Sequence, residues 1–508
     1  MVSEQLHYTT NREEIFIFSN KKMSYLCGVW RFANAYYLLI VKRSIKIMKF
    51  KSVVKSGLNI IIVGCGKVGN ALVRQLSKEG HDITIIDRNR EKVMEIANQY
   101  DIMGLAGNGA SYSVQMEAGI EAADLLIAVT DSDELNLLCC TVAKHVSRCD
   151  TIARVRTPDY STEASYLREK LGLTMIINPE LEAAIEATRI LCLPTALEVN
   201  SFAHGQAELI KFKISEGNML DGMSIQEFGR RGIANVLICM IERDGEVYIP
   251  WGDFVMHHGD VLSFVAHRKT VKSFMQKFGL KTKQVKNTMI VGGGKAAYYL
   301  ANQLIAMGIS VQIIEQNKAR CEELSILLPK AIIINADGSD EEVLFEEGIE
   351  NIESFIPLTG IDEENIMLTL HAKQVSNAKV ITKITRTNFK NVINNLDLGS
   401  IMYPQYITSE AIIAYVRAKN ASKNNHIQTL YQLCDSRVEA IEFSVEEASA
   451  VTNKAIMELN IKKGVLISFI NRNGRIIIPT GQDFIQVNDT VMIVTTQTGF
   501  NTILDILE

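Results

Sequence analysis

The sequence predicts an α/β protein with two tandem Rossmann-like domains, each a doubly wound parallel sheet and each followed by a small α+β domain. Three observations lead to this prediction: strand-like and helix-like segments alternate, a glycine-rich turn follows the first strand, and the pattern occurs twice. Alternation of this kind is typical of parallel sheets with crossover helices, whose ligand crevice lies at the carboxyl ends of the strands.

The first strand, NIIIV at 59–63, leads into a G-x-G-x-x-G turn at Gly64, Gly66 and Gly69, and a helical pattern follows. Such a turn lets backbone amides approach a pyrophosphate at the positive end of the next helix. The second strand ends at Asp87, whose carboxylate can accept a hydrogen bond from a ribose 2′-hydroxyl and repels a 2′-phosphate. The spacing favours NAD or an adenine nucleotide over NADP, although such glycines also occur in turns that only allow tight packing.

The other elements of the first copy follow in order. Short apolar and β-branched runs predict strands at 82–86, 102–105, 124–129, 151–155 and 174–177. The run ELEAAIEATRILCL, at 180–193, predicts a connecting helix. The alternating strands after it predict a small module rich in βαβ units at 198–280, which returns at 427–508.

An internal repeat relates the two halves of the chain. VGCGKVG at 63–69 returns as VGGGKAA at 291–297, 228 residues later, and Asp87 returns as Glu315. With an offset of 229, TDSDELN at 130–136 returns as TGIDEEN, and Asp260 returns as Asp489. A nearly constant offset through separate motifs indicates a duplicated composite unit. The predicted domains are a first Rossmann-like domain at 58–195, its small domain at 196–283, a second Rossmann-like domain at 286–425 and its small domain at 427–508.

Composition excludes several classes of protein. The chain has 508 residues and a formal net charge of -5, and it has no arginine-rich stripe, so no nucleic-acid partner is expected. The nine cysteines are scattered, which argues against a disulfide scaffold, and Cys139 and Cys140 are interpreted as helix core residues. His257 and His258 lack metal-site spacing and are interpreted as surface residues, so no metal site is expected.

The N-terminal segment, 1–57, is expected to be a poorly structured extension. Its most apolar stretch, 25–41, has 17 residues with Arg31 and Asn34 among them, which is short for a membrane span. Two other interpretations of this segment remain. It forms an interfacial helix, or it is translated upstream sequence with Met48 nearer the true start.

The order of VGCGKVG with Asp87, AVTDSDELN at 128–136, ARVRTPDY at 153–160 and the small module, present twice, resembles the RCK family, the regulators of potassium conductance. The resemblance covers 59–508. In tandem form this family supplies the cytoplasmic nucleotide-binding subunits of bacterial Trk-type potassium-uptake systems. It implies RCK N-type domains for the Rossmann-like segments and RCK C-type domains for the small modules.

The resemblance also implies a role for each candidate residue of the first copy. The residues implied to hold the phosphates are Gly64, Cys65, Gly66, Lys67 and Val68, with Gly69 completing the turn. Asp87 would bind the ribose, Asn108 and Gly109 would lie on the adenosine side, Thr130 and Asp131 would form the floor, and Arg154 and Arg156 would approach the phosphate tail. Structural alternatives are a left-handed turn at Asn108, a helix cap at Thr130 and Asp131, and a solvated strand edge at the two arginines.

The second copy differs at several of these positions. Its candidate residues are Gly292, Gly293, Gly294, Lys295, Ala296, Glu315, Asp337, Gly338, Thr359 and Lys383. Ala297 in place of Gly69 and Glu315 in place of Asp87 preserve a dinucleotide site. Asp337 replaces Asn108, Gly360 replaces Asp131, and Lys383 and Thr385 replace the arginine pair, so the second copy is predicted to hold a phosphate-rich nucleotide less well.

The expected function is regulatory. The resemblance implies a cytoplasmic subunit, peripheral on the inner face of the membrane, that binds NAD(H), with ATP or ADP as alternative ligands. Its homo-oligomeric ring would gate a separate, membrane-embedded Trk-type potassium transporter. An enzyme is not expected, because the small modules lack a His/Asp or Ser/Lys constellation. An NAD-dependent oxidoreductase of unknown substrate remains the alternative, and a redox-sensing transcription factor is disfavoured because no helix-turn-helix signature is present.

Overall fold

The computed structural model describes residues 57–193, 195–203, 206–231, 235–280, 284–386, 392–393, 396–422, 427–434 and 437–508. The segment 25–41 and Met48 lie outside these residues, so the interpretations of the N-terminal extension are not addressed. Within the described ranges, no helix is long and apolar enough to cross a membrane.

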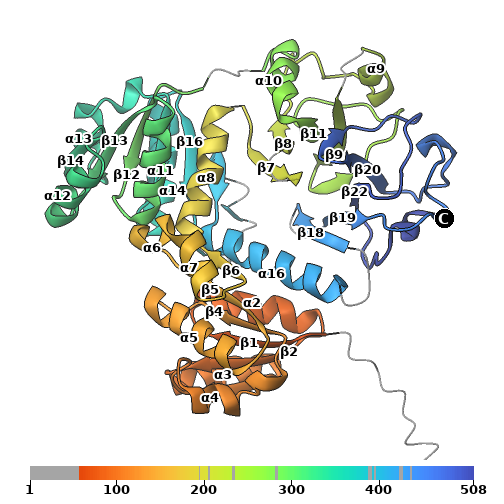
Figure 1. The fold of residues 1–508 in the computed structure, drawn as a ribbon. Helices are drawn as coiled ribbons and strands as arrows, with labels where there is room; N and C mark the ends of the chain where they lie inside the picture. Colours follow the sequence, from red (N-terminus) through yellow and green to blue (C-terminus); the bar gives the residue numbers. More distant parts are fainter. Residues whose placement is uncertain are drawn as a thin grey trace, which may run out of the picture. The chain divides into compact units, whose positions relative to one another are not determined.

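The first Rossmann-like sheet has six parallel strands in the order β3-β2-β1-β4-β5-β6 (Figure 1). The strands are β1 (Asn59–Val63), β2 (Asp82–Asp87), β3 (Met103–Ala106), β4 (Leu125–Ala128), β5 (Asp150–Arg154) and β6 (Met175–Ile177). The ends of every predicted strand agree with the structure to within one residue. Because β1 lies between β2 and β4, the winding direction reverses there, which places a ligand crevice at the carboxyl ends of β1 and β4.

Helices cover both faces of this sheet. Ile60 and Ile62 of β1 belong to one apolar cluster and Ile61 and Val63 to another, and all four are at most 2% exposed. The helices are α2 (Lys67–Lys78), α3 (Arg90–Tyr100), α4 (Tyr112–Glu117), α5 (Asp133–Val146), α6 (Pro158–Thr162) and α7 (Ala164–Lys170), with a short 3-10 turn, η1 (Ile120–Ala122). This two-sided burial explains why the strands read as continuous apolar runs.

The second sheet repeats this topology, with the order β14-β13-β12-β15-β16-β17. Its strands are β12 (Asn287–Val291), β13 (Ser310–Glu315), β14 (Ile332–Asn335), β15 (Ser354–Pro357), β16 (Lys379–Lys383) and β17 (Ser400–Met402). Its helices are α11 (Lys295–Ala306), α12 (Lys318–Leu327), α13 (Glu341–Glu346) and α14 (Asp362–Val375), with the turn η3 (Ile349–Asn351). The prediction of two tandem doubly wound parallel sheets is confirmed.

The helix after each sheet packs on the other copy. Helix α8 (Pro179–Cys192) follows the first sheet, but Ala183, Ala187 and Leu191 belong to the apolar core of the second copy, against α11. Helix α16 (Pro404–Ser422) follows the second sheet, but Ile412, Ile413 and Val416 belong to the core of the first copy. Figure 1 shows α16 beside α2 and α8 beside α11. The predicted connecting helix is therefore present, and it joins the two copies reciprocally.

Each small domain contains a five-stranded antiparallel sheet. The strands of the first are β7 (Glu198–Phe202), β8 (Ala207–Lys213), β9 (Val236–Arg243), β10 (Glu246–Tyr248) and β11 (Val261–His267), with helices α9 (Ile225–Arg230) and α10 (Arg268–Lys277). The strands of the second are β18 (Ile427–Leu433), β19 (Val438–Ser444), β20 (Val465–Arg472), β21 (Arg475–Ile477) and β22 (Thr490–Thr495), with the turns η4 (Ile456–Glu458) and η5 (Ile503–Ile506). The expected α+β class is confirmed, but the expected βαβ units are wrong because neighbouring strands pair antiparallel.

The two small domains share an apolar cluster, and each contains the same ion pair between a buried aspartate and a partly exposed arginine. Phe202 of the first lies against Tyr431 of the second with ring centroids 4.9 Å apart, within a cluster drawn from both sheets. Arg243 donates two hydrogen bonds of 2.7 Å to Asp260, and Arg472 pairs with Asp489 in the same way. The repeated aspartates found in the sequence thus hold the same turn in both copies.

Candidate functional site

The three glycines of the first turn have different structural roles. Gly64 has φ +117°, and a Cβ there would lie 3.0 Å from the backbone of Val129. A Cβ at Gly69 would lie 1.9 Å from the carbonyl oxygen of Gly64. At Gly66, which precedes α2, nothing lies within 4 Å of a built Cβ. Close packing therefore accounts for Gly64 and Gly69, whereas the absence of a side chain at Gly66 leaves open space at the positive end of a helix.

A carboxylate holds each glycine turn by the same two hydrogen bonds. Asp87 accepts from the amide of Cys65 at 2.6 Å and from the amide of Asn89 at 2.9 Å. In the second copy, Glu315 accepts from the amides of Gly293 and Asn317, each at 2.7 Å. The longer side chain of Glu315 thus reproduces the contacts of Asp87. Each oxygen retains a lone pair that can accept a ribose hydroxyl.

The Asn108–Gly109 turn is held by an Asx hydrogen bond. Asn108 is exposed, and its side-chain oxygen accepts from the amide of Ala110 at 3.2 Å. Asn108 is not among the positive-φ residues of the described chain, so the left-handed alternative is wrong. A Cβ at Gly109 would lie 2.3 Å from Val63, and one at Gly338 would lie 2.3 Å from Val291, which gives both glycines a packing role.

The loop after β4 is held by a residue that the sequence reasoning did not select, Asn136. It is fully buried, its side-chain oxygen accepts from the amide and hydroxyl of Thr130, and its amide group donates to the carbonyl of Arg154 at 2.8 Å. Asn365 makes the same contacts with Thr359 and Lys383. The signal was present, because both asparagines stand at the same place in the repeated motif.

Helix α5 is capped by neither Thr130 nor Asp131. Its N-cap is Ser132, whose hydroxyl accepts from the amide of Leu135 at 3.1 Å. Asp131 is fully exposed at the end of the loop. The helix-cap alternative is therefore wrong for Thr130 and Asp131, and both residues remain at the carboxyl end of β4.

Arg154 is mostly buried and Arg156 is partly buried, and neither lies along a solvated strand edge. Strand β5 is between β4 and β6, and the side chain of Arg154 is 11% exposed, with Nη2 donating to the carbonyl of Thr130 at 2.8 Å. Arg156 follows the strand and donates to the carbonyl of Asp131. Burial, together with the charge of Arg156, lowers the pKa of the Arg154 guanidinium. The strand-edge alternative is therefore wrong.

Asp133, another residue that the sequence reasoning did not select, holds the chain after β5. Its carboxylate accepts from the amides of Arg156 at 2.9 Å and Thr157 at 2.7 Å, and Asp362 accepts equivalent bonds in the second copy. Burial would raise the pKa of Asp133, but hydrogen bonds from Thr157 and Arg156 outweigh it and lower the pKa. The repeated D-E-x-N pattern was again the available signal.

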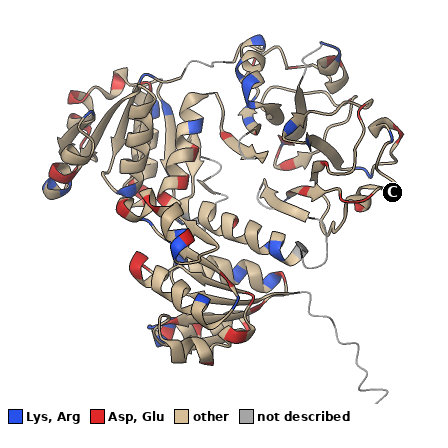
Figure 2. Ribbon diagram, in the orientation of Figure 1, with Lys and Arg blue, Asp and Glu red and all other residues tan. Residues whose placement is uncertain are grey.

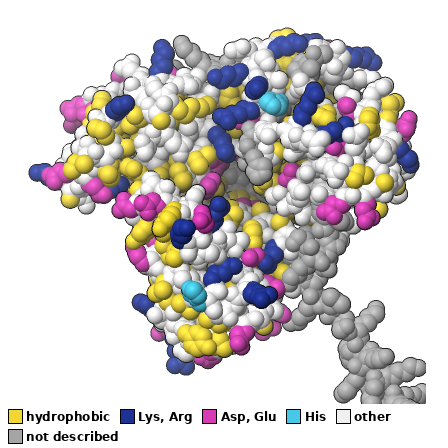
Figure 3. All heavy atoms as spheres, viewed as in Figure 1, with side chains coloured by type: hydrophobic (Ala, Val, Ile, Leu, Met, Phe, Trp, Pro, Cys, Tyr) yellow, Lys and Arg dark blue, Asp and Glu magenta, His cyan; other side chains and the backbone are white. Residues whose placement is uncertain are grey.

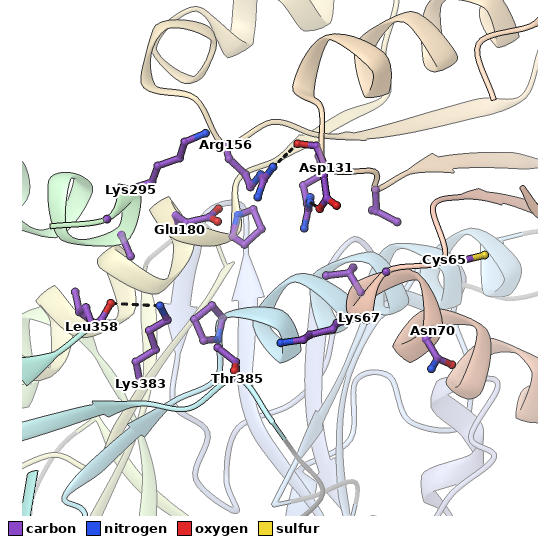
Figure 4. Close-up of a pocket in the computed structure, with 18 of the residues that line it drawn as sticks. Cys65, Lys67, Asn70, Asp131, Arg156, Glu180, Lys295, Leu358, Lys383 and Thr385 are labelled. Atoms are coloured by element: carbon purple, nitrogen blue, oxygen red, sulfur yellow. Dashed lines mark hydrogen bonds and ion pairs between the residues drawn. The ribbon is translucent and has the colours of Figure 1, made fainter. Parts of the chain in front are cut away.

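The two glycine turns face one cavity of about 740 Å³ (Figure 4). Its lining includes eleven candidate residues: Cys65, Gly66, Lys67, Val68, Asp131, Arg154, Arg156, Gly294, Lys295, Ala296 and Lys383. Lys295 of the second turn donates to the hydroxyl of Thr157 in the first copy at 3.2 Å. Because Lys92 also lines this central cavity, six basic side chains surround it, and an anion there would touch both copies.

Glu180 at the start of α8 also lines the central cavity. Burial raises the pKa of its carboxyl, against the opposing effect of Arg156, Arg154 and Lys295. Its Oε2 is buried and has no hydrogen-bond partner in the described part of the chain. Figure 4 shows the carboxylate between Lys295 and Arg156. Glu180 could not be singled out from the sequence, because the segment that forms α8 was interpreted only as a connecting helix.

A second cavity, of about 420 Å³, lies along the carboxyl ends of the strands in the second copy. Its candidate residues are Gly292, Gly293, Gly294, Glu315, Asp337, Gly338, Thr359 and Lys383. Gly294, Leu358 and Lys383 line both cavities. Lys383 donates to the carbonyl of Thr359 at 3.0 Å, which repeats the bond of Arg154 to Thr130. Hydrogen bonds from Ser339 lower the pKa of Asp337.

Six candidates of the first copy lie outside these two linings: Gly64, Gly69, Asp87, Asn108, Gly109 and Thr130. They hold the turn, the sheet and the loop around the crevice, as the contacts above describe. His257 and His258 are exposed near Asp221, and Cys139 and Cys140 are fully buried, as expected. Over the described residues, no cluster of three or more His, Cys, Asp or Glu is arranged to hold a metal ion.

The chain matches two domain families twice, in alternating order. Residues 60–179 and 288–404 match the TrkA-N domain, and residues 209–279 and 440–508 match the TrkA-C domain. Among solved structures, the GsuK channel bound to NAD is similar over 86% of this chain and 77% of that chain, with 17% identity and a TM-score of 0.59. The GsuK RCK domain is similar over 86% and 92%, with 16% identity and a TM-score of 0.59. These likenesses confirm the RCK-type fold.

Three related sequences carry one description, Trk system potassium uptake protein TrkA or its homolog. That of Haemophilus influenzae is 31% identical over 86% of this chain and 95% of its own length, and that of Vibrio alginolyticus is 31% identical over the same shares. That of Archaeoglobus fulgidus is 30% identical over 86% and 97%. With both domain families matched in tandem, the chain belongs to the TrkA family of Trk system potassium uptake proteins.

Proposed function

We propose that this protein is a cytoplasmic, nucleotide-binding regulatory subunit that gates a separate membrane-embedded potassium transporter. The observation that carries the proposal is the central cavity, because both glycine turns and basic side chains from both copies line it. An anionic ligand there would contact Lys67 and Arg156 of the first copy together with Lys295 of the second. Its binding would therefore depend on how the two copies are arranged.

The ligand class follows from the chemistry of the two ends of the site. Asp87 and Glu315 offer carboxylate oxygens to a ribose, and the helix starts at Gly66 and Gly294 offer amides to phosphates. NAD(H) fits this arrangement, and the similar GsuK channel has been solved with NAD. ATP and ADP are the alternative ligands, because the basic central cavity can accept a terminal phosphate, which carries more negative charge than the bridging pyrophosphate of NAD.

Gating needs a ligand that distinguishes two arrangements of the copies. A tenfold difference in affinity between two states supplies about 1.4 kcal/mol per site, so several sites acting together shift a population decisively. The reciprocally packed helices α8 and α16 connect each sheet to a small domain. A change at the central cavity would therefore reach the small domains and, through them, the transporter.

A ring of several chains is the assembly we propose. Leu138 of α5 and Met367 of α14 are 52% and 66% exposed and occupy matching positions of the repeat. Each chain thus presents two similar helix faces, each with an exposed apolar residue, and in a closed ring such faces would pair with those of neighbouring copies. The face shown in Figure 3 carries interspersed acidic and basic side chains, and Figure 2 shows acidic and basic residues distributed along the ribbon. This mixture differs from the basic stripe that is typical of nucleic-acid-binding proteins.

A titration of the full chain with NADH, NAD, ATP and ADP tests the proposal, combined with an assay for nucleotide turnover. We expect saturable binding of at least one nucleotide, a change of conformation on binding, detected by small-angle scattering, and no turnover. Sustained hydride transfer or hydrolysis would instead favour the alternative, an NAD-dependent oxidoreductase. Absence of binding by all four nucleotides would contradict the proposal.

A further inference from the structure

A separate cavity of about 390 Å³ lies between α2 of the first copy and α16, and we call it the α2–α16 pocket. The lining residues that matter here are Lys67, Ala71, Arg74, Tyr100, Thr385 and Tyr406. Its volume falls within the range of small-molecule sites, about 300–1,000 Å³. The candidate nucleotide residues do not account for it, because Lys67 alone among them lines it.

The repeat explains why this cavity exists on one side of the molecule. Ala71 of α2 corresponds to Tyr299 of α11, at the same 228-residue offset that relates the two glycine turns. Tyr299 is 6% exposed; its hydroxyl donates to the carbonyl of Arg156 at 2.9 Å and accepts from Asn178 at 2.9 Å. In the second copy an aromatic ring with a polar tip therefore fills the space between α11 and α8.

The first copy lacks this ring but retains its surroundings. Thr385, which corresponds to Arg156, lines the α2–α16 pocket, and Ala71 stands where the tyrosine would begin. Helix α16 occupies on α2 the position that α8 occupies on α11. The pocket is thus open where the second copy places a planar, hydrogen-bonding ring.

The lining matches a planar ligand that carries negative charge. Tyr100, Tyr406 and Ile413 provide aromatic and apolar surface. Lys67 and Arg74 add two positive charges against the single carboxylate of Glu410, because Arg386, which also lines the pocket, is already paired with Glu363. Among the described residues, neither the Lys67 ammonium nor the Arg74 guanidinium has a hydrogen-bond or ion-pair partner; the carbonyl of Arg74 accepts from the Ser77 hydroxyl. The Oδ1 atom of Asn70 is buried without a hydrogen-bond partner there, which leaves an acceptor for a ring amino group.

We propose that the α2–α16 pocket is a second ligand site, which takes a planar heteroaromatic anion of the size of a nucleoside monophosphate. The ring occupies the place that Tyr299 fills in the second copy, and the anionic group contacts Arg74 and Lys67. Lys67, Asn70 and Thr385 line both this pocket and the central cavity. Figure 4 shows Lys67 extending from α2 towards Thr385. Occupancy of the pocket therefore alters the lining of the central cavity and the contact of α16 with the first copy.

Photo-crosslinking of the full chain with 8-azidoadenosine 5′-monophosphate tests this site. We expect label on Tyr100 or Tyr406, located by tandem mass spectrometry and displaced by excess AMP more effectively than by adenosine. Ala71→Tyr, which gives α2 the residue of the second copy, should reduce this label at least tenfold. Ser77→Tyr, on the same helix outside the pocket, is the matched control and should retain it.

A second variant keeps the experiment decisive if Ala71→Tyr fails to fold. Arg74→Ala leaves the cavity open and removes a cation, so we expect AMP to lose its advantage over adenosine as a competitor. Label found only beside Gly66 and Gly294, or label on Tyr100 and Tyr406 that Ala71→Tyr leaves unchanged, would overturn the proposal. The position of the label distinguishes failure of this proposal from failure of the proposed function. Loss of nucleotide binding at the glycine turns would leave the label on Tyr100 and Tyr406 in place.

Discussion

At the scale of single residues, Asp87 joins the end of β2 to the glycine turn of the first copy. We predict that Asp87→Ala weakens NADH binding by about 1.5 to 3 kcal/mol, the scale of a hydrogen bond to a charged group. The variant should fold, because the core of β1 and β2 is apolar and independent of this carboxylate. Calorimetric titration with NADH measures the effect, and unchanged affinity would mean that the ribose is held elsewhere.

Gly66 and Gly294 are matched positions for testing the predicted difference between copies. Each precedes a helix, and at each a Cβ would meet nothing within 4 Å. Aspartate is also favourable before a helix, so Gly66→Asp and Gly294→Asp should both fold. The added carboxylate would enter the central cavity and repel phosphate. We predict that Gly66→Asp removes most high-affinity ATP binding and that Gly294→Asp has a smaller effect.

The expected difference between the two copies comes from the basic side chains that each copy contributes to the central cavity. Arg154 and Arg156 offer planar, multidentate donors, whereas Lys383 is a single donor whose pKa is lowered by burial. Titration of both variants with ATP and NADH checks the prediction. Equal losses of ATP affinity, or a larger loss in Gly294→Asp, would contradict it.

At the scale of helices, α16 and α8 pack on the two copies by different chemistry. Helix α16 places Arg417 against Glu79, and Tyr415 and Lys419 against Asp150. In the second copy, Met307 stands in place of Glu79 and Lys379 in place of Asp150. Lys379 donates to the carbonyl of Ala196 at 2.7 Å. The contact of α16 is therefore ionic at its edge, while that of α8 depends mainly on apolar packing.

Asp150 makes the α16 contact dependent on pH. Burial would raise the pKa of Asp150, but hydrogen bonds from Lys419 and Tyr415 outweigh it and lower the pKa. Because the folded pKa lies below the unfolded value of about 3.9, the stabilisation is complete above that pH and is lost as pH falls through the folded pKa. We predict that Asp150→Asn costs about 1 kcal/mol at pH 7, a value reduced for the partial exposure of the carboxylate.

Hydrogen–deuterium exchange of α16 measures this effect. Exchange should be roughly fivefold faster in Asp150→Asn at pH 7, the factor for about 1 kcal/mol, and the difference should narrow only below about pH 4. Asp397→Asn, which removes the exposed partner of Lys373, is the control and should leave α16 unchanged. A difference that already disappears at pH 6 would show that another group controls the contact.

At the scale of the whole molecule, the repeat gives each chain two matching exposed helix faces, at Leu138 and Met367. We predict that the protein is larger than its 56.6 kDa monomer in solution and that Leu138→Glu with Met367→Glu converts it to the monomer. Light scattering after size exclusion gives the mass directly. Ile326→Glu, at an 81% exposed apolar residue of α12, is the control and should assemble as the wild type does. An unchanged mass in the double variant would contradict the proposed ring.

The sequence could predict features whose causes are local or repeated. Buried parallel strands need continuous apolar runs, so the strands of the first sheet could be located to within one residue. The turn at Gly64, Gly66 and Gly69 could be recognised because the tight backbone turn before a phosphate-binding helix needs glycine at fixed positions. The duplication could be seen because Glu315 and Asp489 return at a nearly constant offset from Asp87 and Asp260.

The roles of individual polar residues could be predicted less well, because several of these residues form hydrogen bonds with partners that are distant in the chain. Asn136 joins Thr130 to Arg154 across the ends of two strands, and Asn108 forms a local turn that its residue type alone left open. Glu180 became notable only when α8 placed it against Lys295 of the other copy. Such contacts depend on which surfaces meet, and residue spacing does not record this.

By itself, then, the sequence determined the two parallel sheets, their glycine turns, the duplicated order of domains and the family. Only the tertiary structure decided that α8 packs on the second copy and α16 on the first. It also decided that both glycine turns face one central cavity, and that Ala71 leaves open in the first copy the space that Tyr299 fills in the second. The physical reason is that hydrophobic periodicity specifies which face of a helix is buried but not the surface that buries it. That choice is made by apolar packing between segments more than a hundred residues apart, such as α8 with α11 and α2 with α16.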